Sequence, residues 1–350
     1  MNKFVVSCLV AALLFVVPVA AFITTDAGSL ESERREIVAF PDLPAKLRSR
    51  TVKEYFRGID AFFADHFPLR TSLLRISIGL RDIFGDNLNM DKCYRGKEDW
   101  LFLGNSFGHC VERLQGKIVF STPALKRQTE RYAMIRDAAE NSGAEFFIFI
   151  GPDKSSVYPE YLPPVLVPAQ RRFISPLLEA LSGAGVKVYD PTARLAGEKS
   201  GELLYYRTDT HWNARGAYEA FEGFRTWAGL PELPPLSFDK APAYDGDLLV
   251  IGAYTSFPLS VGDNFTLDWS VPLSLHDEGD VITNARAVSE KTAWVFGDSF
   301  AAALRPYMAA TFKDVRFFKH EDFEAAMVSQ LSKPDMILWV IVERNFARSG

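Results

Sequence analysis

Two short motifs hold the residues best suited to nucleophilic catalysis. The apolar pair Val295-Phe296 ends in Gly297-Asp298-Ser299 and passes at once into the helix-prone stretch 301–304. A strand, a tight glycine turn and a helix place the Ser299 hydroxyl at the carboxyl end of a sheet, where open α/β folds have their active sites. Ser299 is therefore the candidate nucleophile, and a simple helix cap is the structural alternative.

The second motif, Asp209-Thr210-His211-Trp212, supplies an acid and a base two positions apart. In an extended backbone, side chains at positions i and i+2 point to the same face. Asp209 and His211 are therefore expected to approach Ser299 from one segment. Half of a metal site is the alternative, but no cluster of Cys or His lies near these residues in the sequence. Acid–base use with a serine is favoured over metal binding.

A third stretch completes the pattern: residues 151–163 read Gly-Pro-Asp-Lys-Ser-Ser-Val-Tyr-Pro-Glu-Tyr-Leu-Pro. Together with the two motifs above, it resembles the SGNH-hydrolase-like domain of the alginate O-acetyltransferase family, whose members are known as AlgJ and AlgX. In that family the Asp and His precede the Ser, which reverses the order of ordinary SGNH esterases. This chain has the reversed order, and three separated motifs make the resemblance specific.

The resemblance implies an O-acetyltransferase that moves an acetyl group onto hydroxyls of an alginate-like exopolysaccharide in the periplasm. Ser299 would attack an acetyl ester, with His211 as general base and Asp209 orienting the imidazole. A sugar hydroxyl would then resolve the acetyl-enzyme. Further candidates for substrate contacts are Lys154, Tyr158, Arg207 and Trp212. No cofactor and no metal are expected.

The same resemblance implies three kinds of partner: a polysaccharide acceptor, a membrane-bound O-acyltransferase that supplies acetyl, and other subunits of a polysaccharide-synthesis complex. Two alternatives stay open. A carbohydrate acetylesterase would use the same residues with water as acceptor, and a non-catalytic subunit of a modification or export complex would not need the serine.

The chain ends shortly after Glu343-Arg344-Asn345, which favours an AlgJ-type arrangement without an appended carbohydrate-binding module. A net charge of −5 gives no support for nucleic-acid binding.

The N-terminal part predicts attachment to a membrane. An apolar run from Phe4 to Ile23 follows Lys3, which indicates a signal peptide or, preferably, a retained inner-membrane anchor over residues 1–24. The rest of the chain is then expected in the periplasm. Residues 25–90 are expected to form a helical N-terminal extension, because apolar residues recur at helical spacing between Val52 and Phe84.

The pattern of residues 91–350 predicts one catalytic domain. Strands alternate with helices, which indicates an α/β fold of the SGNH-hydrolase-like (flavodoxin-like) kind, a mainly parallel sheet flanked by helices. Strands are expected at 145–150, 186–189, 293–296, 315–318 and 336–342, and helices at 122–141, 174–182, 217–228 and 322–331. An insertion around 230–290, rich in Pro and Gly, is expected to be a lid or binding element. Cys93 and Cys110 are expected to form a disulfide in an oxidising compartment.

Overall fold

The structure is a computed structural model that describes residues 40–43, 55–60, 62, 90–252, 254, 262–329 and 332–346. The chain forms two units, one of Met1–Leu88 with Val250–Phe257 and one of Asn89–Leu249 with Pro258–Gly350. In the first unit, residues 55–60 are helical. The expected membrane segment, 1–24, and most of the expected helical extension, 25–90, lie outside the described residues. Within the described ranges, no helix is both long and apolar enough to cross a membrane.

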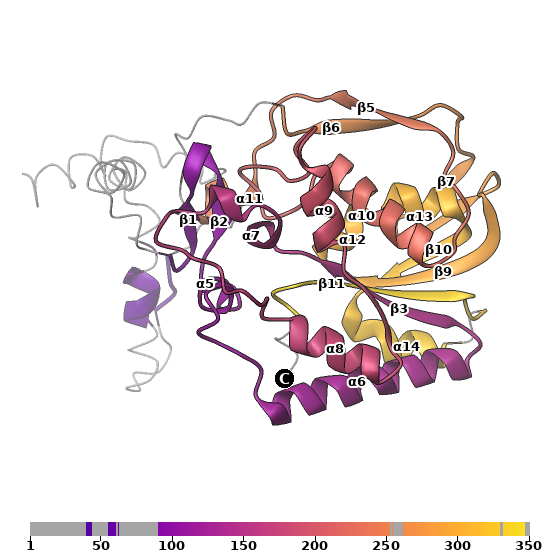
Figure 1. Ribbon diagram of the computed structural model, residues 1–350, viewed down its shortest axis with the longest axis horizontal. Coiled ribbons are helices and arrows are strands. Elements are labelled where there is room, and N and C mark those ends of the chain that lie inside the picture. Colours follow the sequence, from indigo (N-terminus) through magenta and orange to yellow (C-terminus); the bar gives the residue numbers. More distant parts are fainter. Residues whose placement is uncertain are drawn as a thin grey trace, which may run out of the picture. The chain divides into compact units, whose positions relative to one another are not determined.

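A seven-stranded sheet forms the centre of the second unit (Figure 1). Its order is β4 (Lys187–Tyr189), β3 (Glu145–Gly151), β11 (Met336–Val342), β9 (Ser289–Gly297), β10 (Phe312–Phe318), β8 (Val281–Asn284) and β7 (Leu275–Asp277). Neighbours from β4 to β10 are parallel, whereas β8 pairs antiparallel with both β10 and β7. The mainly parallel α/β sheet predicted from the sequence is therefore confirmed.

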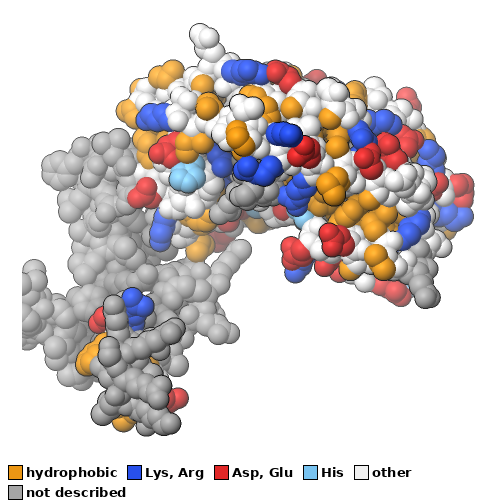
Figure 2. Space-filling model, turned by 90° about the horizontal axis from the view of Figure 1, so that it is seen from below, with side chains coloured by type: hydrophobic (Ala, Val, Ile, Leu, Met, Phe, Trp, Pro, Cys, Tyr) orange, Lys and Arg blue, Asp and Glu red, His pale blue; other side chains and the backbone are white. Residues whose placement is uncertain are grey.

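Helices cover both faces of this sheet (Figure 1). One face carries α6 (Thr122–Asn141), α8 (Ser175–Gly183) and α14 (Phe323–Val328), and the other carries α9 (Thr192–Glu198), α10 (Ala214–Trp227), α12 (Ser299–Ala302) and α13 (Arg305–Thr311). The long helix α6 begins after Ser121, whose hydroxyl accepts the N–H of Ala124 at 3.3 Å. Gly143, with φ of 91°, reverses the chain into β3. Figure 2 shows basic and acidic side chains interspersed on the face seen from below.

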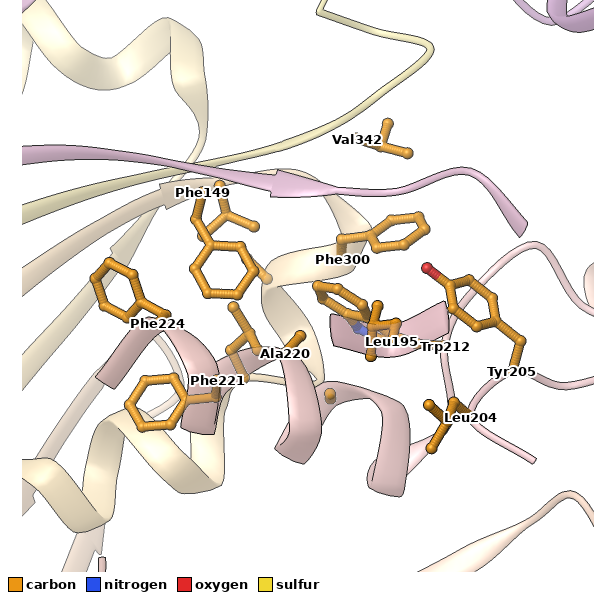
Figure 3. Close-up of a cluster of buried hydrophobic side chains, with 14 of the residues drawn as sticks. Phe149, Leu195, Leu204, Tyr205, Trp212, Ala220, Phe221, Phe224, Phe300 and Val342 are labelled. Carbon is orange, nitrogen blue, oxygen red and sulfur yellow. The ribbon is translucent and has the colours of Figure 1, made fainter. Parts of the chain in front are cut away.

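The central strands β3 and β11 bury both of their faces, and alternate residues enter two different cores. In β3, Phe147 and Phe149 join the core beneath α10, whereas Phe146 and Ile148 join the core beneath α6 and α8. Figure 3 shows the first core, in which Trp212 and Phe300 pack near Leu195 and Ala220. This two-sided burial explains why β3 and β11 are apolar runs rather than alternating ones.

Smaller elements surround the sheet. Two small antiparallel sheets are made by β1 (Cys93–Arg95) with β2 (Leu101–Leu103) and by β5 (Leu236–Lys240) with β6 (Phe265–Trp269). Short helices are α5 (Cys110–Leu114), α7 (Lys154–Val157) and α11 (Asp247–Ile251), with 3-10 turns at Lys97–Asp99, Pro159–Tyr161 and His320–Asp322. The expected insertion, 230–290, thus contributes β5 and β6 to a separate two-stranded sheet and β7 and β8 to the antiparallel edge of the main sheet.

The predicted disulfide is wrong, because Cys93 and Cys110 are both free thiols. Cys93 lies buried in β1, and the Cys110 thiol at the start of α5 donates to the carbonyl of Phe107 at 2.9 Å. Burial raises the pKa of the Cys93 thiol to about 12 and also raises the pKa of the Cys110 thiol. Burial thus holds each thiol in the unreactive, protonated form.

Candidate active site

Ser299 is the first residue of α12 and follows β9 directly, at the carboxyl edge of the sheet. The cap of α12 is Asp298, whose Oδ1 accepts the N–H of Phe300 at 3.0 Å. The other oxygen of Asp298 accepts the N–H of Val342 at 2.9 Å and so ties the turn to the neighbouring strand β11. Because Asp298 is the cap, the Ser299 hydroxyl is left for another use.

The segment carrying Asp209 and His211 is a turn, not the extended strand expected from the sequence. Tyr205 and Trp212 form an isolated antiparallel bridge, and the chain reverses between them. The N–H of His211 donates to Asp209 Oδ1 at 2.9 Å, which is a side-chain-to-backbone turn of the kind that aspartate favours. Asp209 and His211 are brought together by this local hydrogen bond rather than by strand alternation.

The structure brings together all three predicted catalytic residues. His211 Nδ1 lies 2.6 Å from Asp209 Oδ1, and His211 Nε2 lies 2.7 Å from Ser299 Oγ. An ionised carboxylate only accepts, so Nδ1 carries the proton and Nε2 accepts from the serine hydroxyl. The Asp209 side chain is 4% exposed and that of His211 is 26% exposed. The arrangement has a buried acid, a base and an accessible hydroxyl in one line, which is the geometry of a nucleophilic triad.

The charge on Asp209 is maintained by its hydrogen bonds. Burial alone raises the pKa of this carboxyl, but hydrogen bonding to His211, the charge of His211 and the N–H of Asp247 together outweigh burial and lower the pKa. Asp209 is therefore a carboxylate at neutral pH, as the proton on His211 Nδ1 requires.

Asp247, at the start of α11, is a site residue that the sequence reasoning missed. Its N–H donates to Asp209 Oδ2 at 2.8 Å, and its carboxylate accepts the N–H and the hydroxyl of Thr210 at 2.8 and 2.7 Å. Burial, followed by the charge of Asp209, raises its pKa. The available signal was the acidic run Tyr244-Asp245-Gly246-Asp247, but nothing local in that run relates it to His211.

Asp209, His211 and Asp247 also form a group whose ligand atoms lie within 4.8 Å of one another. A metal ion there would have to replace existing hydrogen bonds. Both oxygens of Asp209 accept N–H groups, both oxygens of Asp247 accept from Thr210, and Nδ1 of His211 faces Asp209. Hydrogen bonds within the chain therefore account for the orientation of all three side chains, and we derive no step through a metal.

The four residues predicted to contact substrate have different positions. Lys154, Tyr158 and Trp212 are 4%, 1% and 1% exposed, and so their side chains contact the protein interior rather than the surface. Tyr158 Oη accepts the N–H of Leu204 at 2.9 Å, and Trp212 packs on Phe300 in the core shown in Figure 3. This burial argues against direct substrate contact for these three. Arg207 is half-buried, and its substrate contact stays a prediction.

A cavity of about 200 Å³ is lined by residues that follow β3 and β11. Ion pairs cross it: Arg344 with Asp153 at 2.7 Å, and Arg172 with Glu343 at 2.9 Å. Burial raises the pKa of Asp153 to about 6, against the opposing charge of Arg344. Neither His211 nor Ser299 lines this cavity, so we treat it as separate from the triad.

Comparison with known proteins gives one family-model match and one curated relative that are similar to this chain. Residues 93–224 match the family model of the SGNH hydrolase-like domain of acetyltransferase AlgX. Over 209 residues the chain is 26% identical to a protein of Pseudomonas syringae pv. tomato named probable alginate O-acetylase AlgJ. The resemblance to the AlgJ and AlgX family is confirmed. The match to the AlgJ protein covers 56% of this chain and 50% of the relative, so this chain spans about half the length of the curated relative that it matches.

Solved structures agree on the fold. The O-acetyltransferase domain of Pseudomonas putida AlgJ is similar with a TM-score of 0.52 and 17% identity, over 74% of this chain and 93% of that one. The structure of Bacillus cereus PatB1 with a sulfonyl adduct is similar with a TM-score of 0.53 and 15% identity, over 74% of this chain and 97% of PatB1. At these identities the likeness establishes the fold alone, an SGNH-hydrolase-like α/β fold with a mainly parallel sheet. The AlgX-type match contains Asp209 and His211 but ends before Asp247 and Ser299.

Proposed function

We propose that this chain is an O-acetyltransferase that moves an acetyl group onto hydroxyls of an alginate-like exopolysaccharide through an acetyl-enzyme on Ser299. The observation that carries the proposal is the hydrogen-bonded line from Asp209 through His211 to Ser299, with 2.6 and 2.7 Å between the paired atoms. The likeness to the AlgX acetyltransferase domain and to the probable alginate O-acetylase of P. syringae supports acetyl as the transferred group.

In the first half-reaction, Ser299 Oγ attacks the carbonyl carbon of an acetyl ester while its proton passes to His211 Nε2. The tetrahedral intermediate then collapses, the donor alcohol takes that proton and leaves, and acetyl remains on Ser299. Asp209 stabilises the imidazolium that exists between the two proton transfers. The backbone N–H of Ser299, at the first residue of α12, is the proposed donor to the oxyanion.

In the second half-reaction, a sugar hydroxyl attacks the acetyl-enzyme. His211 Nε2 removes the proton of that hydroxyl and returns it to Ser299 Oγ as the acyl bond breaks, so that the enzyme is regenerated. The 26% exposure of the His211 side chain leaves room for an acceptor to approach from the surface. Ser299 is itself exposed, so both the nucleophile and its base can be reached from solvent.

The proposal includes the setting of the reaction. We place the catalytic domain in the periplasm, with residues 1–24 as an inner-membrane anchor, a membrane-bound O-acyltransferase as the source of acetyl, and further subunits of a polysaccharide-synthesis complex as partners. The apolar run from Phe4 to Ile23 supports the anchor. The family resemblance supports the donor and the complex.

The test is acetyl transfer by the full chain from a chromogenic acetyl ester to an oligosaccharide, with the products analysed by mass spectrometry. Ser299→Ala and His211→Ala should abolish both release of the chromophore and acetylation of the sugar. His276→Ala is the matched control, because His276 is a surface histidine that pairs with Glu278. Free acetate as the sole product would replace the transferase by an esterase. Unchanged turnover in Ser299→Ala would refute the triad.

A further inference from the structure

Lys154, in the short helix α7 after β3, is buried beneath the turn that carries the catalytic acid and base. Its Nζ donates to three backbone carbonyls of that turn: those of Tyr206 at 3.0 Å, Arg207 at 2.9 Å and Asp209 at 2.7 Å. An ammonium has three N–H donors, so this set uses all of them. The charge also lies 5.5 Å from the centre of the Trp100 ring and 5.4 Å from that of Phe102.

Asp247 holds the same turn from another direction. Its carboxylate accepts both the N–H and the hydroxyl of Thr210, which lies between Asp209 and His211. The chain entering α11 packs closely on this turn, because a Cβ on Gly246 would lie 2.0 Å from the carbonyl oxygen of Thr208. The N–H of Leu248 donates to that same oxygen at 3.1 Å.

We infer that Lys154 and Asp247 are positioning residues, which hold the turn of residues 206–211 so that Asp209 and His211 meet Ser299 in reactive geometry. This inference rests on the proposed function of the triad. No hydrogen bond of the described residues joins either side chain to Ser299. Lys154 acts through backbone carbonyls, and Asp247 acts through Thr210 and through its charge, which lies 3.9 Å from His211 Nδ1.

We call Lys154 and Asp247, with their hydrogen bonds to the turn, the clamp. The need for it follows from the backbone of the turn. Residues 206–211 contain no helix or strand, and the flanking strand-like contact is the single bridge between Tyr205 and Trp212. A turn without a ladder has carbonyl groups that must find partners elsewhere. A cation that binds three of them fixes their directions together, and a shift of about 1 Å in a catalytic group costs about 100-fold in rate.

The experiment compares Lys154→Met, Lys154→Arg and Asp247→Ala in the full chain, with Lys199→Met as the matched control. Lys199 also donates to a backbone carbonyl, that of Val157 at 2.6 Å, but outside this turn. Two rates are measured: turnover of a chromogenic acetyl ester, and covalent labelling of Ser299 by methanesulfonyl fluoride, followed by mass spectrometry. Circular dichroism shows whether each variant is folded, and proton NMR follows the low-field resonance of the His211 Nδ1–H.

We expect Lys154→Met and Asp247→Ala to lower kcat and the labelling rate by about 10- to 100-fold with KM within about twofold, and to lose or broaden the low-field resonance. Lys154→Arg should recover part of the rate, because a guanidinium also donates to several carbonyls. Lys199→Met should match the wild type. A residue that serves the fold alone would also lower kcat at constant KM, but only in proportion to the folded fraction that circular dichroism reports, and it would leave the His211 resonance of the folded chains unchanged.

Folded Lys154→Met and Asp247→Ala chains with wild-type kcat, labelling rate and NMR signal would overturn the inference. If Lys154→Met does not fold, Asp247→Ala decides, since its carboxylate is about one-third exposed and can be removed without opening the core. Failure of the proposed function has a different signature: Ser299→Ala would then keep wild-type turnover, whatever the clamp variants do.

Discussion

Asp209→Asn is the sharpest single test of the site. In the wild type, Asp209 Oδ1 accepts both the N–H and the Nδ1–H of His211, and Oδ2 accepts the N–H of Asp247. An amide has one oxygen and one NH₂ group in place of two acceptors. If the oxygen stays on His211, the NH₂ faces the N–H of Asp247, donor against donor. If the amide flips, the NH₂ faces Nδ1, and the imidazole must carry its proton on Nε2.

If the amide oxygen stays on His211, the imidazole keeps its tautomer but the negative charge of Asp209 is lost. If the amide flips, His211 Nε2 carries a proton and can no longer accept the Ser299 hydroxyl proton. A triad whose acid becomes an amide loses about 10⁴ in kcat, which corresponds to about 5 kcal/mol of transition-state stabilisation. Asp247 Oδ2 lies 3.9 Å from His211 Nδ1 and can replace part of that charge. We therefore expect a loss of at least about 10²-fold in Asp209→Asn, and a larger one when Asp247→Asn is added.

The assay is single-turnover labelling of Ser299 by methanesulfonyl fluoride, together with steady-state turnover of a chromogenic acetyl ester, with thermal unfolding as the check on folding. The matched control is Asp239→Asn, on the surface strand β5 and far along the chain from the turn. A folded Asp209→Asn variant that keeps more than about a tenth of the wild-type kcat would refute the role given to Asp209.

Three further predictions follow from the structure. In Gly246→Ala the new Cβ would lie 2.0 Å from the Thr208 carbonyl oxygen, so we expect a loss of about 1 to 3 kcal/mol in unfolding free energy and a lower kcat, measured by denaturant titration and ester turnover. Trp212→Phe should lower stability by about 1 to 3 kcal/mol and leave KM unchanged, because the indole is buried in the core rather than facing a substrate; a raised KM at wild-type stability would restore it as a substrate contact. Burial lowers the pKa of Lys154 from 10.5 to about 8. The unfolded chain therefore binds more protons between those two pH values, and the free energy of unfolding gains about 3 kcal/mol from this residue as pH rises through that window, with no contribution to the slope below pH 8. The buried thiols of Cys93 and Cys110, whose pKa values are raised, contribute the opposite slope over the same pH range. Denaturant titrations should therefore show the gain as a difference between the wild type and Lys154→Met that grows by about 3 kcal/mol across the window, because both chains share these thiols.

The parts of the fold that were predicted correctly are those with a strong local pattern. The helix over Thr122–Asn141 was predicted from Thr122-Pro123 at its start and Gly143 at its end, although the cap is Ser121 rather than Thr122, and β3 and β11 follow from continuous apolar runs of strand length. The antiparallel strands β7 and β8 were not predicted, since both are short and lie in a Pro- and Gly-rich stretch. β7 pairs with β8, and β8 joins the sheet only through β10, which is about 30 residues further along the chain.

For the site, residue identity was determined by sequence and residue placement by the tertiary structure. Ser299, His211 and Asp209 were identifiable because few residue types can supply a nucleophile, a base and an orienting acid. The turn that joins Asp209 to His211, by contrast, differs from the extended strand that their spacing predicts. Its actual shape depends on hydrogen bonds from Lys154 and Asp247, more than 35 residues away on either side.

The sequence by itself therefore determined which residue types could form a triad and the succession of the main strands and helices, because side-chain chemistry and hydrophobic periodicity are local properties. Only the tertiary structure decided that Lys154 enters the interior rather than a substrate site, and that Asp247 joins the catalytic turn. A buried ammonium is stable only where several acceptors converge on it, and such convergence exists only once distant segments have packed together.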